Sequence, residues 1–487
     1  MITEFRKTWK NTVSTFQADP IRYVYPESLE EIVAAVKDAE SDRLPIRPVG
    51  SGHSFNDIAC GNGVMIDIKK LNRILEKGDK SFVHPKNGNT FLEIEAGIII
   101  QQLYAELEQR KLAIVNMGGV YHQTLAGAIA TGTHGSGLGL PAVSGMVRSM
   151  VLVASNGRKF RIEPEGGISD TLKQNQLEPE ITLVQNNTDF NAALVHLGCF
   201  GIIYSYVLEV LPEYFMRESK RMETWETVKE ILRKGDIFKE TRSFMILLNP
   251  YCYNKQYWCI MIKHRISPNL YNWFGAKKRN LITRLGNHSF IFYYARWRLN
   301  KKPEITPKFL YNALKSQQDI VYIDKAQRVL YQAAERIKKH AYDTEAAFEF
   351  TVAKFEDLIE KIMARLEVIQ KEGNIYLQSP MGIRFVKKSN ALLTPESDRF
   401  VFYIDAPVLK GSVGTEGLLD EMQELFIREG GIFHWGKINN RLTSHLHTIR
   451  ERYPKLDDWL QVMKKYNAEN LFNNSFTDRL QLTETLP

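Results

Sequence analysis

Apolar and polar positions follow two different periods along the first 212 residues, so both helices and strands are expected there. Apolar side chains recur at helical spacing over residues 29–40, and Ser28 precedes Glu31 by three positions, as in a capping box. The helical period returns over residues 98–111. Short runs of branched and aromatic residues, bounded by turn residues, predict strands at 46–50, 64–71 and 91–97.

Residues 146–162 predict a β-hairpin. Two strand-like runs flank the dipeptide Asn156-Gly157, and this pair favours the tight turn whose twist matches that of antiparallel strands. We therefore expect residues 1–212 to form one α+β unit that is rich in glycine turns.

The pattern changes after Leu211-Pro212, where Lys, Trp and Tyr become more frequent and glycine turns become rare. A mixture of strand-like and helix-like runs predicts a second α+β unit over residues 213–429. The remaining segment, 430–487, is expected to return to the first unit. The strand-like runs are 243–250, 257–264 and 400–407, and the helix-like runs are 307–340 and 353–371.

Composition places the chain among globular proteins, since 44% of its residues are hydrophobic and 25% are charged. The net charge is +8, but the basic residues occur in short groups with acids between them, as at 277–279, 301–302 and 338–339. A solvated basic surface is the favoured interpretation, so no nucleic-acid partner is expected. A footprint for an anionic membrane is the alternative that this pattern leaves open.

The cysteines predict a reducing compartment. Cys60, Cys199, Cys252 and Cys259 show no C-x-x-C spacing and are too sparse for a disulfide framework. The N-terminal residues lack the apolar core of a secretory signal, and no apolar stretch approaches the ~20 residues of a membrane helix. We therefore expect a cytoplasmic protein, with peripheral membrane contact left open.

A first glycine cluster covers residues 47–57. Gly50-Ser51-Gly52 lets backbone N–H groups converge on an anion such as phosphate. It is not a dinucleotide-binding fingerprint, because Phe55 stands where the third glycine would be, and no Gly-Lys-Ser/Thr of a P-loop is present. Taken alone, the cluster fits a phosphate nest and an ordinary strand-to-strand turn about equally.

A second cluster of small residues covers Thr124–Gly137. So little side-chain volume over so long a stretch requires the backbone to pack closely against a large flat group, or against itself. A bound cofactor is the natural candidate, and a tight structural packing element is the alternative.

Four motifs in this order resemble the FAD-dependent sugar-lactone and alditol oxidases, which belong to the vanillyl-alcohol-oxidase-type flavoprotein superfamily. They are PVGSGHSFNDIA at 48–59, LAGAIATGTHGSG at 125–137, LGCFGIIYSYVLEV at 197–210 and HWGK at 434–437. The resemblance covers nearly the whole chain. It implies a two-domain α+β fold: an FAD-binding domain of two small α/β subdomains (1–212), a substrate or cap domain with an antiparallel sheet and helices (213–429), and a C-terminal segment returning to the FAD domain (430–487).

The resemblance also implies how FAD is held. The first glycine loop binds the pyrophosphate through main-chain N–H groups, and His53 is joined covalently to the 8α-methyl of the isoalloxazine. No cysteine lies between Cys60 and Cys199, so a second covalent link is not expected, and no metal is expected. The implied cofactor contacts are Pro48, Val49, Gly50, Ser51, Gly52, His53, Ser54, Thr124, Ile129, Gly132, Thr133, His134, Gly135, Ile203 and His434.

Three further residues are implied in catalysis, in which a substrate C–H passes a hydride to flavin N5. Glu349 of AAFEFTVAK is similar to a family glutamate that orients or deprotonates the substrate hydroxyl, and Arg384 of MGIRFV is similar to the arginine of the family segment I-R-T. Lys437 of HWGK would stabilise the negative charge of the reduced flavin. The chain departs from the family at Thr351, in place of an arginine, and at Phe385, in place of a threonine. Both changes remove polar groups that would bind sugar hydroxyls, so a simple alditol is a less secure substrate.

Three functions follow from these observations. The expected function is FAD-dependent oxidation of a CH–OH group in a sugar lactone, alditol or related carbohydrate, with oxygen reoxidising the flavin. A dehydrogenase of the same superfamily, with another alcohol as substrate and an electron carrier as acceptor, is the second. A non-catalytic module that binds nucleic acid or anionic lipid is the third, and an isoelectric point near 9.0 is its only support.

Overall fold

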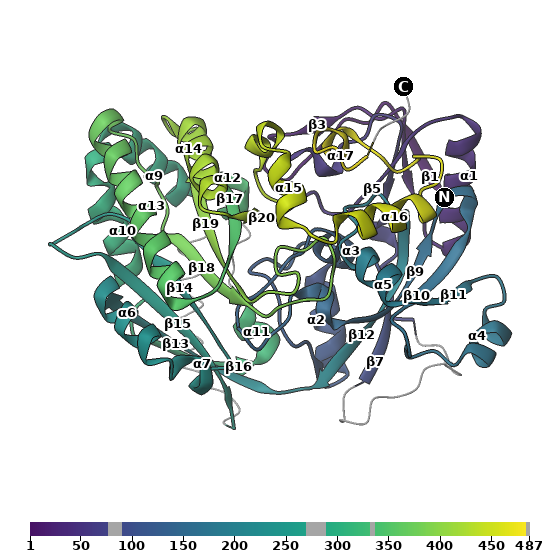
Figure 1. Ribbon diagram of the computed structural model, residues 1–487, viewed down its shortest axis with the longest axis horizontal. Coiled ribbons are helices and arrows are strands. Elements are labelled where there is room, and N and C mark those ends of the chain that lie inside the picture. The colour runs from purple at the N-terminus through teal and green to yellow at the C-terminus, as the bar shows by residue number, and fades with distance from the viewer. Residues whose placement is uncertain (76–89, 269–288, 332–336, 484–487) are drawn as a thin grey trace.

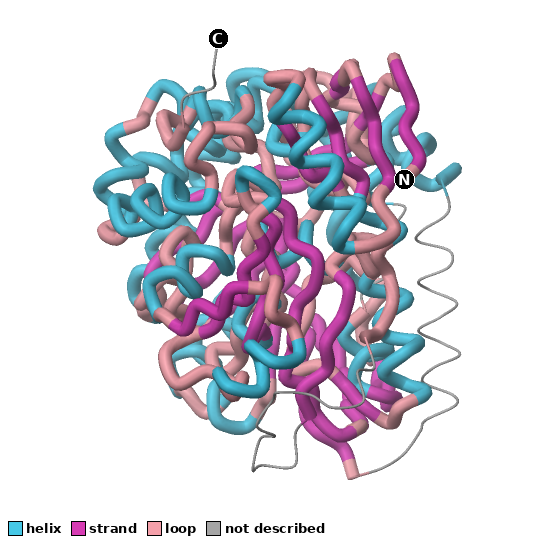
Figure 2. Tube along the Cα trace, turned by 90° about the vertical axis from the view of Figure 1, so that its right-hand side faces the viewer, coloured by secondary structure: helices cyan, strands magenta, loops and turns pink. Residues whose placement is uncertain are grey.

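Three β-sheets of four, six and eight strands organise the chain (Figure 1). The computed structural model describes residues 1–75, 90–268, 289–331 and 337–483. Most strands run through the middle of the molecule, with helices on either side (Figure 2). Among the described helices, none combines the length and the apolar character that crossing a membrane requires.

The four-stranded sheet has the order β1-β4-β6-β5, and its last three strands are parallel. Helix α1 (Leu29–Ser41) connects β4 to β5, and the Ser28 hydroxyl accepts the N–H of Glu31 at 3.2 Å, so Ser28 is the N-cap as predicted. The Glu31 carboxylate accepts the N–H of Glu27 at 2.8 Å in place of that of Ser28, so only this half of the predicted capping box is confirmed. The strands are β1 (Ile2–Phe5), β4 (Arg22–Tyr25), β5 (Ile46–Val49) and β6 (Val64–Asp67), with a separate pair β2 (Trp9–Lys10) and β3 (Gln17–Ala18).

The six-stranded sheet contains the predicted hairpin. Strands β9 (Val147–Val153) and β10 (Lys159–Glu163) pair antiparallel, and Asn156 and Gly157 have φ of 61° and 64°, so the hairpin prediction is confirmed. The sheet order is β11-β10-β9-β12-β7, and β8 pairs with β12. The other elements of this part are β7 (Thr90–Glu95), β8 (Leu112–Ala113), β11 (Thr182–Gln185), β12 (Ile202–Pro212), α2 (Ile100–Gln109), α3 (Leu125–Ala130), α4 (Thr171–Leu177) and α5 (Asn187–Leu194).

The eight-stranded sheet is antiparallel throughout and has the order β16-β13-β15-β14-β18-β19-β17-β20. Its strands are β13 (Phe215–Thr224), β14 (Ser243–Leu248), β15 (Trp258–Ser267), β16 (Ile320–Lys325), β17 (Ala341–Glu349), β18 (Met381–Val386), β19 (Val401–Leu409) and β20 (Ile432–Phe433). Its helices are α6 (Trp225–Lys234), α7 (Ile237–Glu240), α9 (Ser289–Lys301), α10 (Thr306–Lys315), α11 (Ala326–Leu330), α12 (Ile337–His340), α13 (Val352–Gly373) and α14 (Thr415–Arg428).

One helix prediction in this part is wrong. The run 307–340 is interrupted by strand β16, which pairs with β13 along the edge of the large sheet. The run IVYIDK is rich in β-branched and aromatic residues, which suit a strand, and sheet pairing prevails over local helical preference. Residues 332–336 of that run and the basic triplet 277–279 lie outside the described residues. The run 353–371 is confirmed as α13.

The segment after residue 430 touches both the large sheet and the N-terminal part of the chain. Strand β20 pairs with β17, whereas the N–H of Ile46 donates to the carbonyl of Leu471 at 2.7 Å, and Arg479 forms an ion pair with Asp57 at 3.0 Å. In Figure 1 the helices of this segment lie beside the N-terminal elements. They are α15 (His447–Arg452), α16 (Leu456–Tyr466) and α17 (Ser475–Arg479).

Candidate active site

A large cavity lies where the three parts of the chain meet. It contains about 1150 Å³ of space free of atoms, including its solvent-open part. Its walls come from the two glycine clusters, from strands β17 and β18, and from the segment 434–437. Residues more than 300 positions apart in the sequence therefore share one site.

All seven residues predicted in the first loop, 48–54, line this cavity. The loop leaves the carboxyl end of β5, and Gly52 has φ of 67°, a conformation that other residues adopt only with strain. A Cβ on Gly50 would stand 2.1 Å from Oγ1 of Thr124. The two glycine clusters therefore pack directly against each other.

Only some of the residues predicted in the second cluster line the cavity. Thr124, Thr133 and His134 line the wall, but Ile129, Gly132 and Gly135 do not. The turn of α3 explains the difference, because Ala126, Gly127, Ala130 and Thr131 share the face toward the cavity while Ile129 is fully buried in the core. A Cβ on Gly135 would stand 2.1 Å from Oδ1 of Asn116, so that glycine permits close packing of the neighbouring chain.

The later motifs contribute Ile203, His434, Lys437 and Arg384, which all line the cavity. The two departures from the family pattern lie elsewhere. Thr351 caps α13 by accepting the N–H of Lys354 at 3.2 Å. Phe385 is fully buried in a cluster of aromatic rings. Neither substitution therefore changes the polarity of the cavity wall.

The prediction for Glu349 is not compatible with the structure. Glu349 is the last residue of β17, its side chain is 61% exposed, and its carboxylate lies 3.1 Å from Nζ of Lys354. It does not line the cavity. The strand ends there and the chain turns into α13, so this carboxylate faces solvent instead of the site.

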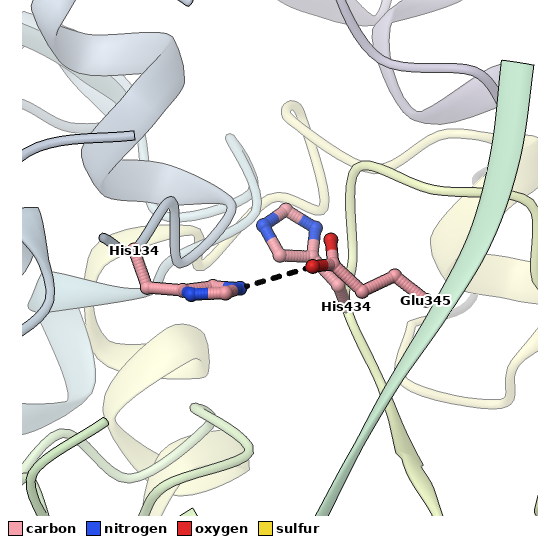
Figure 3. A group of neighbouring side chains, drawn as sticks. All are labelled: His134, Glu345 and His434. Atoms are coloured by element: carbon pink, nitrogen blue, oxygen red, sulfur yellow. Dashed lines mark ion pairs between the residues drawn. The ribbon is translucent and has the colours of Figure 1, made fainter. Parts of the chain in front are cut away.

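Glu345, four residues earlier on β17, is the carboxylate that the structure brings to the cavity. Its oxygens lie 3.4 Å from Nε2 of His134, 3.5 Å from Nζ of Lys437 and 3.9 Å from Arg384. Figure 3 shows the side chains of His134 and His434, which come from other parts of the chain, beside this carboxylate, and the dashed line joins His134 to Glu345. The ring of His134 also stacks on Tyr403 at 3.6 Å.

The opposite charges in this cluster stabilise each other's ionised forms. Burial opposes ionisation of Glu345, but the charge of Lys437, together with that of His134 when its ring is protonated, outweighs burial and holds the pKa of this carboxyl well below its usual range. Burial alone would lower the pKa of Lys437, but the carboxylates of Asp343, Glu345 and Asp405 raise it instead. Lys437 lies 2.6 Å from Asp343. The cavity thus holds an ionised carboxylate and an ionised ammonium that water barely reaches.

Asp405, on neighbouring strand β19, behaves differently. Burial, reinforced by the negative charges of Glu345 and Asp343, raises its pKa to about 7, although Arg384 and Lys437 oppose the shift. Its side chain accepts the N–H of Gly382. This carboxyl therefore changes charge near neutral pH.

His134, Glu345 and His434 also have the composition of a metal site, since one ligand atom from each lies within 4.8 Å of the others. Two cations, Lys437 and Arg384, already neutralise the Glu345 carboxylate. A divalent ion there would face both positive charges at short range. We therefore interpret the trio as a proton-handling group, and the absence of a metal stays a prediction.

Arg47 and His196 also line the cavity, and the sequence did not predict them as site residues. Both are buried, and Arg47 donates to the carbonyls of Leu197 and Phe472, the latter at 3.3 Å. The N–H of Gly198 donates to Nδ1 of His196 at 3.1 Å, so the proton of the neutral ring is on Nε2. Burial, and then the charge of Arg47, lowers the pKa of His196 to about 3, so the ring stays neutral.

These residues fit a dinucleotide cofactor. Within the described residues, Nε2 of His196 and the hydroxyl of Ser51 are buried without a hydrogen-bond partner, and both line the cavity. Buried polar atoms are normally paired, so a polar occupant is the natural partner for them. The glycine and alanine walls leave room for a flat ring and a backbone approach to phosphate.

Comparison with known families agrees with this geometry. Residues 20–163 match the FAD binding domain family, and residues 207–480, more than half of the chain, match the family described as D-arabinono-1,4-lactone oxidase. The L-gulonolactone oxidase of Mus musculus is 24% identical over 486 residues, covering 97% of this chain and 98% of the relative. The L-gulono-1,4-lactone dehydrogenase of Mycobacterium tuberculosis is also 24% identical, with the same coverage. The D-arabinono-1,4-lactone oxidase of Yarrowia lipolytica is 26% identical over 81% of this chain and 69% of its own.

The fold is similar to that of a solved oxidase structure. Cholesterol oxidase from B. sterolicum superposes with a TM-score of 0.74 at 14% identity, covering 98% of this chain and 97% of the other. This likeness concerns the fold alone. Together with the FAD-binding match, it confirms the two-part α+β flavoprotein fold expected from the motifs.

The glycine loops meet around one cavity, and the cavity also contains the lysine of HWGK and a buried carboxylate. FAD is the cofactor, and the chain is an oxidoreductase. The family matches cover both the cofactor-binding part and the part that supplies Glu345 and Arg384. The chain belongs to the D-arabinono-1,4-lactone oxidase family of FAD-dependent enzymes.

Proposed function

We propose that the protein oxidises a CH–OH carbon of a sugar-1,4-lactone or a closely related carbohydrate in this cavity. The observation that carries the proposal is the cluster of Glu345, Lys437, Arg384 and His434 on the same cavity as the glycine loops. Such a cluster offers hydrogen-bond acceptors and donors to several hydroxyl groups at once. The names of the relatives, which act on gulono- and arabinono-lactones, support this substrate class.

FAD, when bound, supplies the two-electron acceptor for the oxidation. Glu345 is ionised, so it accepts a hydrogen bond from the substrate hydroxyl and orients it. Arg384 and Lys437 fix the direction of this carboxylate and present positive charge to negative charge that develops during the reaction. The chain thus contributes position and electrostatic field.

The hydroxyl proton is taken up by the pair of His134 and Glu345. Nδ1 of His134 donates to the carbonyl of Gly135 at 3.0 Å, so Nε2 is the nitrogen that can accept a proton. A proton on Nε2 is stabilised by Glu345, 3.4 Å away. Tyr403 stacks on this ring and keeps it from rotating.

His53 is the proposed covalent anchor for the flavin. It lies in the loop that leaves β5 and lines the cavity together with Ser51 and Gly52. A histidyl link would prevent loss of the cofactor and make the flavin a stronger oxidant. Oxygen is the proposed acceptor of the electrons, with an electron carrier as the alternative.

The cytoplasm is the proposed location. All four cysteines are free thiols, as a reducing compartment requires.

Steady-state assays on the purified, FAD-loaded chain test the proposed reaction. D-arabinono-1,4-lactone, L-gulono-1,4-lactone and a simple alditol are compared as substrates, each with oxygen and with a redox dye as acceptor. We expect lactone-dependent peroxide formation, with the alditol turned over at least tenfold less efficiently. Dye reduction without peroxide would identify a dehydrogenase, and no bleaching of the flavin by any lactone would refute the proposed substrate class.

A further inference from the structure

Helix α9 carries an exposed aromatic stripe outside the site described above. Phe290, Tyr293, Tyr294 and Trp297 are 68%, 52%, 48% and 50% exposed, and Ile291 beside them is exposed as well. Their spacing of three and four residues places the aromatic rings on one face of the helix. Among the described residues, every exposed tyrosine and tryptophan lies on this helix.

The stripe is continuous and ordered. Phe290 stacks on Tyr294 with ring centroids 6.3 Å apart, and Tyr294 lies 5.9 Å from Trp297. Nζ of Lys301 lies 4.8 Å from the centre of the Trp297 ring. The rings therefore form one surface that ends in a positive charge.

The opposite face of α9 is fixed to the protein. Ala295 and Leu299 are buried, and Ala295 packs in a cluster with Ala341 and Leu409. Arg296 donates to the carbonyl of Lys410 at 3.0 Å. The helix is thus anchored, and its exposed rings are not a consequence of a loose element.

The charge of α9 has one sign. Arg296, Arg298 and Lys301 lie on the helix and Lys302 follows it, whereas the first carboxylate after them is Glu304. Tyrosine and tryptophan suit the boundary between lipid headgroups and acyl chains, because each ring has an apolar body and a polar edge. Cations beside them attract an anionic surface.

We propose that the exposed face of α9 binds the surface of an anionic phospholipid bilayer, with the aromatic rings at the headgroup level. The combination of ring stripe and cation-only charge favours lipid over a second copy of this chain, because two copies would bring like charges together. The enzyme would then act at a membrane surface. This inference does not depend on which lactone is the substrate.

Vesicle co-sedimentation of the full FAD-loaded chain tests the proposal. Vesicles of phosphatidylcholine alone are compared with vesicles that contain about one third phosphatidylglycerol, at low and at high salt. We expect binding to the anionic vesicles only, and release as salt increases. Binding to neither kind of vesicle, or equal binding to both, would overturn the proposal.

Two sets of variants locate the surface. Tyr293→Ser, Tyr294→Ser and Trp297→Ser together remove the rings, and Arg298→Gln, Lys301→Gln and Lys302→Gln together remove cations. We expect the ring variant to lose at least tenfold in vesicle affinity, and the charge variant to lose about fivefold per cation. The matched control is Leu172→Ser, Lys173→Gln and Leu177→Ser on α4, another exposed helix with apolar side chains, and it should bind as the natural chain does.

Retained flavin absorbance and lactone turnover establish that each variant is folded. Vesicle binding by both α9 variants at the natural level would exclude this helix as the contact. Light scattering is measured in parallel, and a dimer that the ring variant abolishes would assign the face to self-association. Competition by a single-stranded oligonucleotide, lost in the same variants, would assign it to nucleic acid.

Discussion

The ionisation of Glu345 is decided by two opposing effects of comparable size. Its carboxylate is almost completely buried, which by itself favours the neutral acid. Lys437 at 3.5 Å favours the charged form, as does His134 at 3.4 Å once its ring is protonated, and these charges prevail. A buried carboxylate that stays ionised is a rigid hydrogen-bond acceptor, which is what orientation of a substrate hydroxyl requires.

The substitution Glu345→Gln tests this role with little change of shape. The amide cannot stabilise a proton on His134, so we expect kcat/KM for the lactone to fall by roughly 10²-fold, the scale for losing one well-placed charge. Glu349→Gln is the matched control on the same strand and should stay within about twofold. Steady-state kinetics, with flavin content measured by absorbance, check both values. Equal losses in the two variants would remove Glu345 from its proposed role.

Sequence periodicity alone could not choose between these two glutamates. In a strand, the side chains of every second residue point to the same face, as do those of 343, 345, 347 and 349. The sequence pattern therefore does not distinguish Glu345 from Glu349. The deciding facts are that β17 ends at Glu349 and that Glu345, but not Glu349, lines the cavity. The signal that could have identified the site carboxylate is the pair of acids Asp343 and Glu345 within a run of mostly apolar residues that forms a buried strand.

His196 makes the stability of the protein depend on pH. Burial and Arg47 lower its pKa in the folded chain to about 3, against about 6.5 for an unperturbed histidine. Between these values the unfolded chain binds a proton that the folded chain does not, so stability falls as the pH decreases below about 6.5. At pH 5 this difference costs about 2 kcal/mol relative to pH 7.

We expect His196→Asn to remove most of that dependence, because its amide oxygen can accept the N–H of Gly198 but does not titrate in this range. The variant should lose less stability between pH 7 and pH 5 than the natural chain, by about 2 kcal/mol. Urea unfolding at the two pH values measures this. His447→Asn, which removes an exposed imidazole, is the control. A parallel shift of both variants would mean that His196 is not the responsible group.

At the scale of elements, the turn between β9 and β10 shows how a local signal determines structure. Asn156 and Gly157 adopt φ of 61° and 64°, as the sequence predicts for this dipeptide. The run 307–340 shows the opposite case, because its central residues pair with β13, far away in the chain. Short turns are encoded by their own residues, whereas edge strands depend on partners that a local pattern does not contain.

Gly157→Ala tests the turn. Alanine at this position would have to adopt a positive φ, and its Cβ would stand 3.0 Å from Cε of Lys37 and from Cγ1 of Val33. We therefore expect a loss of about 1–2 kcal/mol in the free energy of unfolding. Gly139→Ala is the control, since a Cβ there meets no atom within 4 Å. Chemical denaturation measures both variants. A neutral Gly157→Ala would contradict the strain that the positive φ implies.

At the scale of the whole molecule, the cavity is the place where distant parts of the chain are joined. Its walls combine residues 47–54, the stretch around 118–134, strands β17 and β18, and the segment 434–437. The motifs indicated which segments would meet and which cofactor would join them. They did not reveal Arg47, His196 or Glu345, because the roles of these side chains arise from burial and from neighbours that only the folded chain supplies.

A cofactor that contacts all of these cavity walls should stabilise the folded chain as a whole. The variant His53→Ala allows the stability to be measured with and without FAD. Without the proposed covalent link, FAD becomes removable, and the same chain can be studied stripped and loaded. Saturating FAD at about 100 times its dissociation constant adds roughly 2.7 kcal/mol, so we expect the midpoint of thermal unfolding to rise by about 3 degrees on loading. The natural chain should keep its flavin after acid precipitation, whereas the variant should release it. Acid-stable flavin in His53→Ala would identify a different anchor, and an unchanged midpoint on loading would mean that FAD does not join these walls.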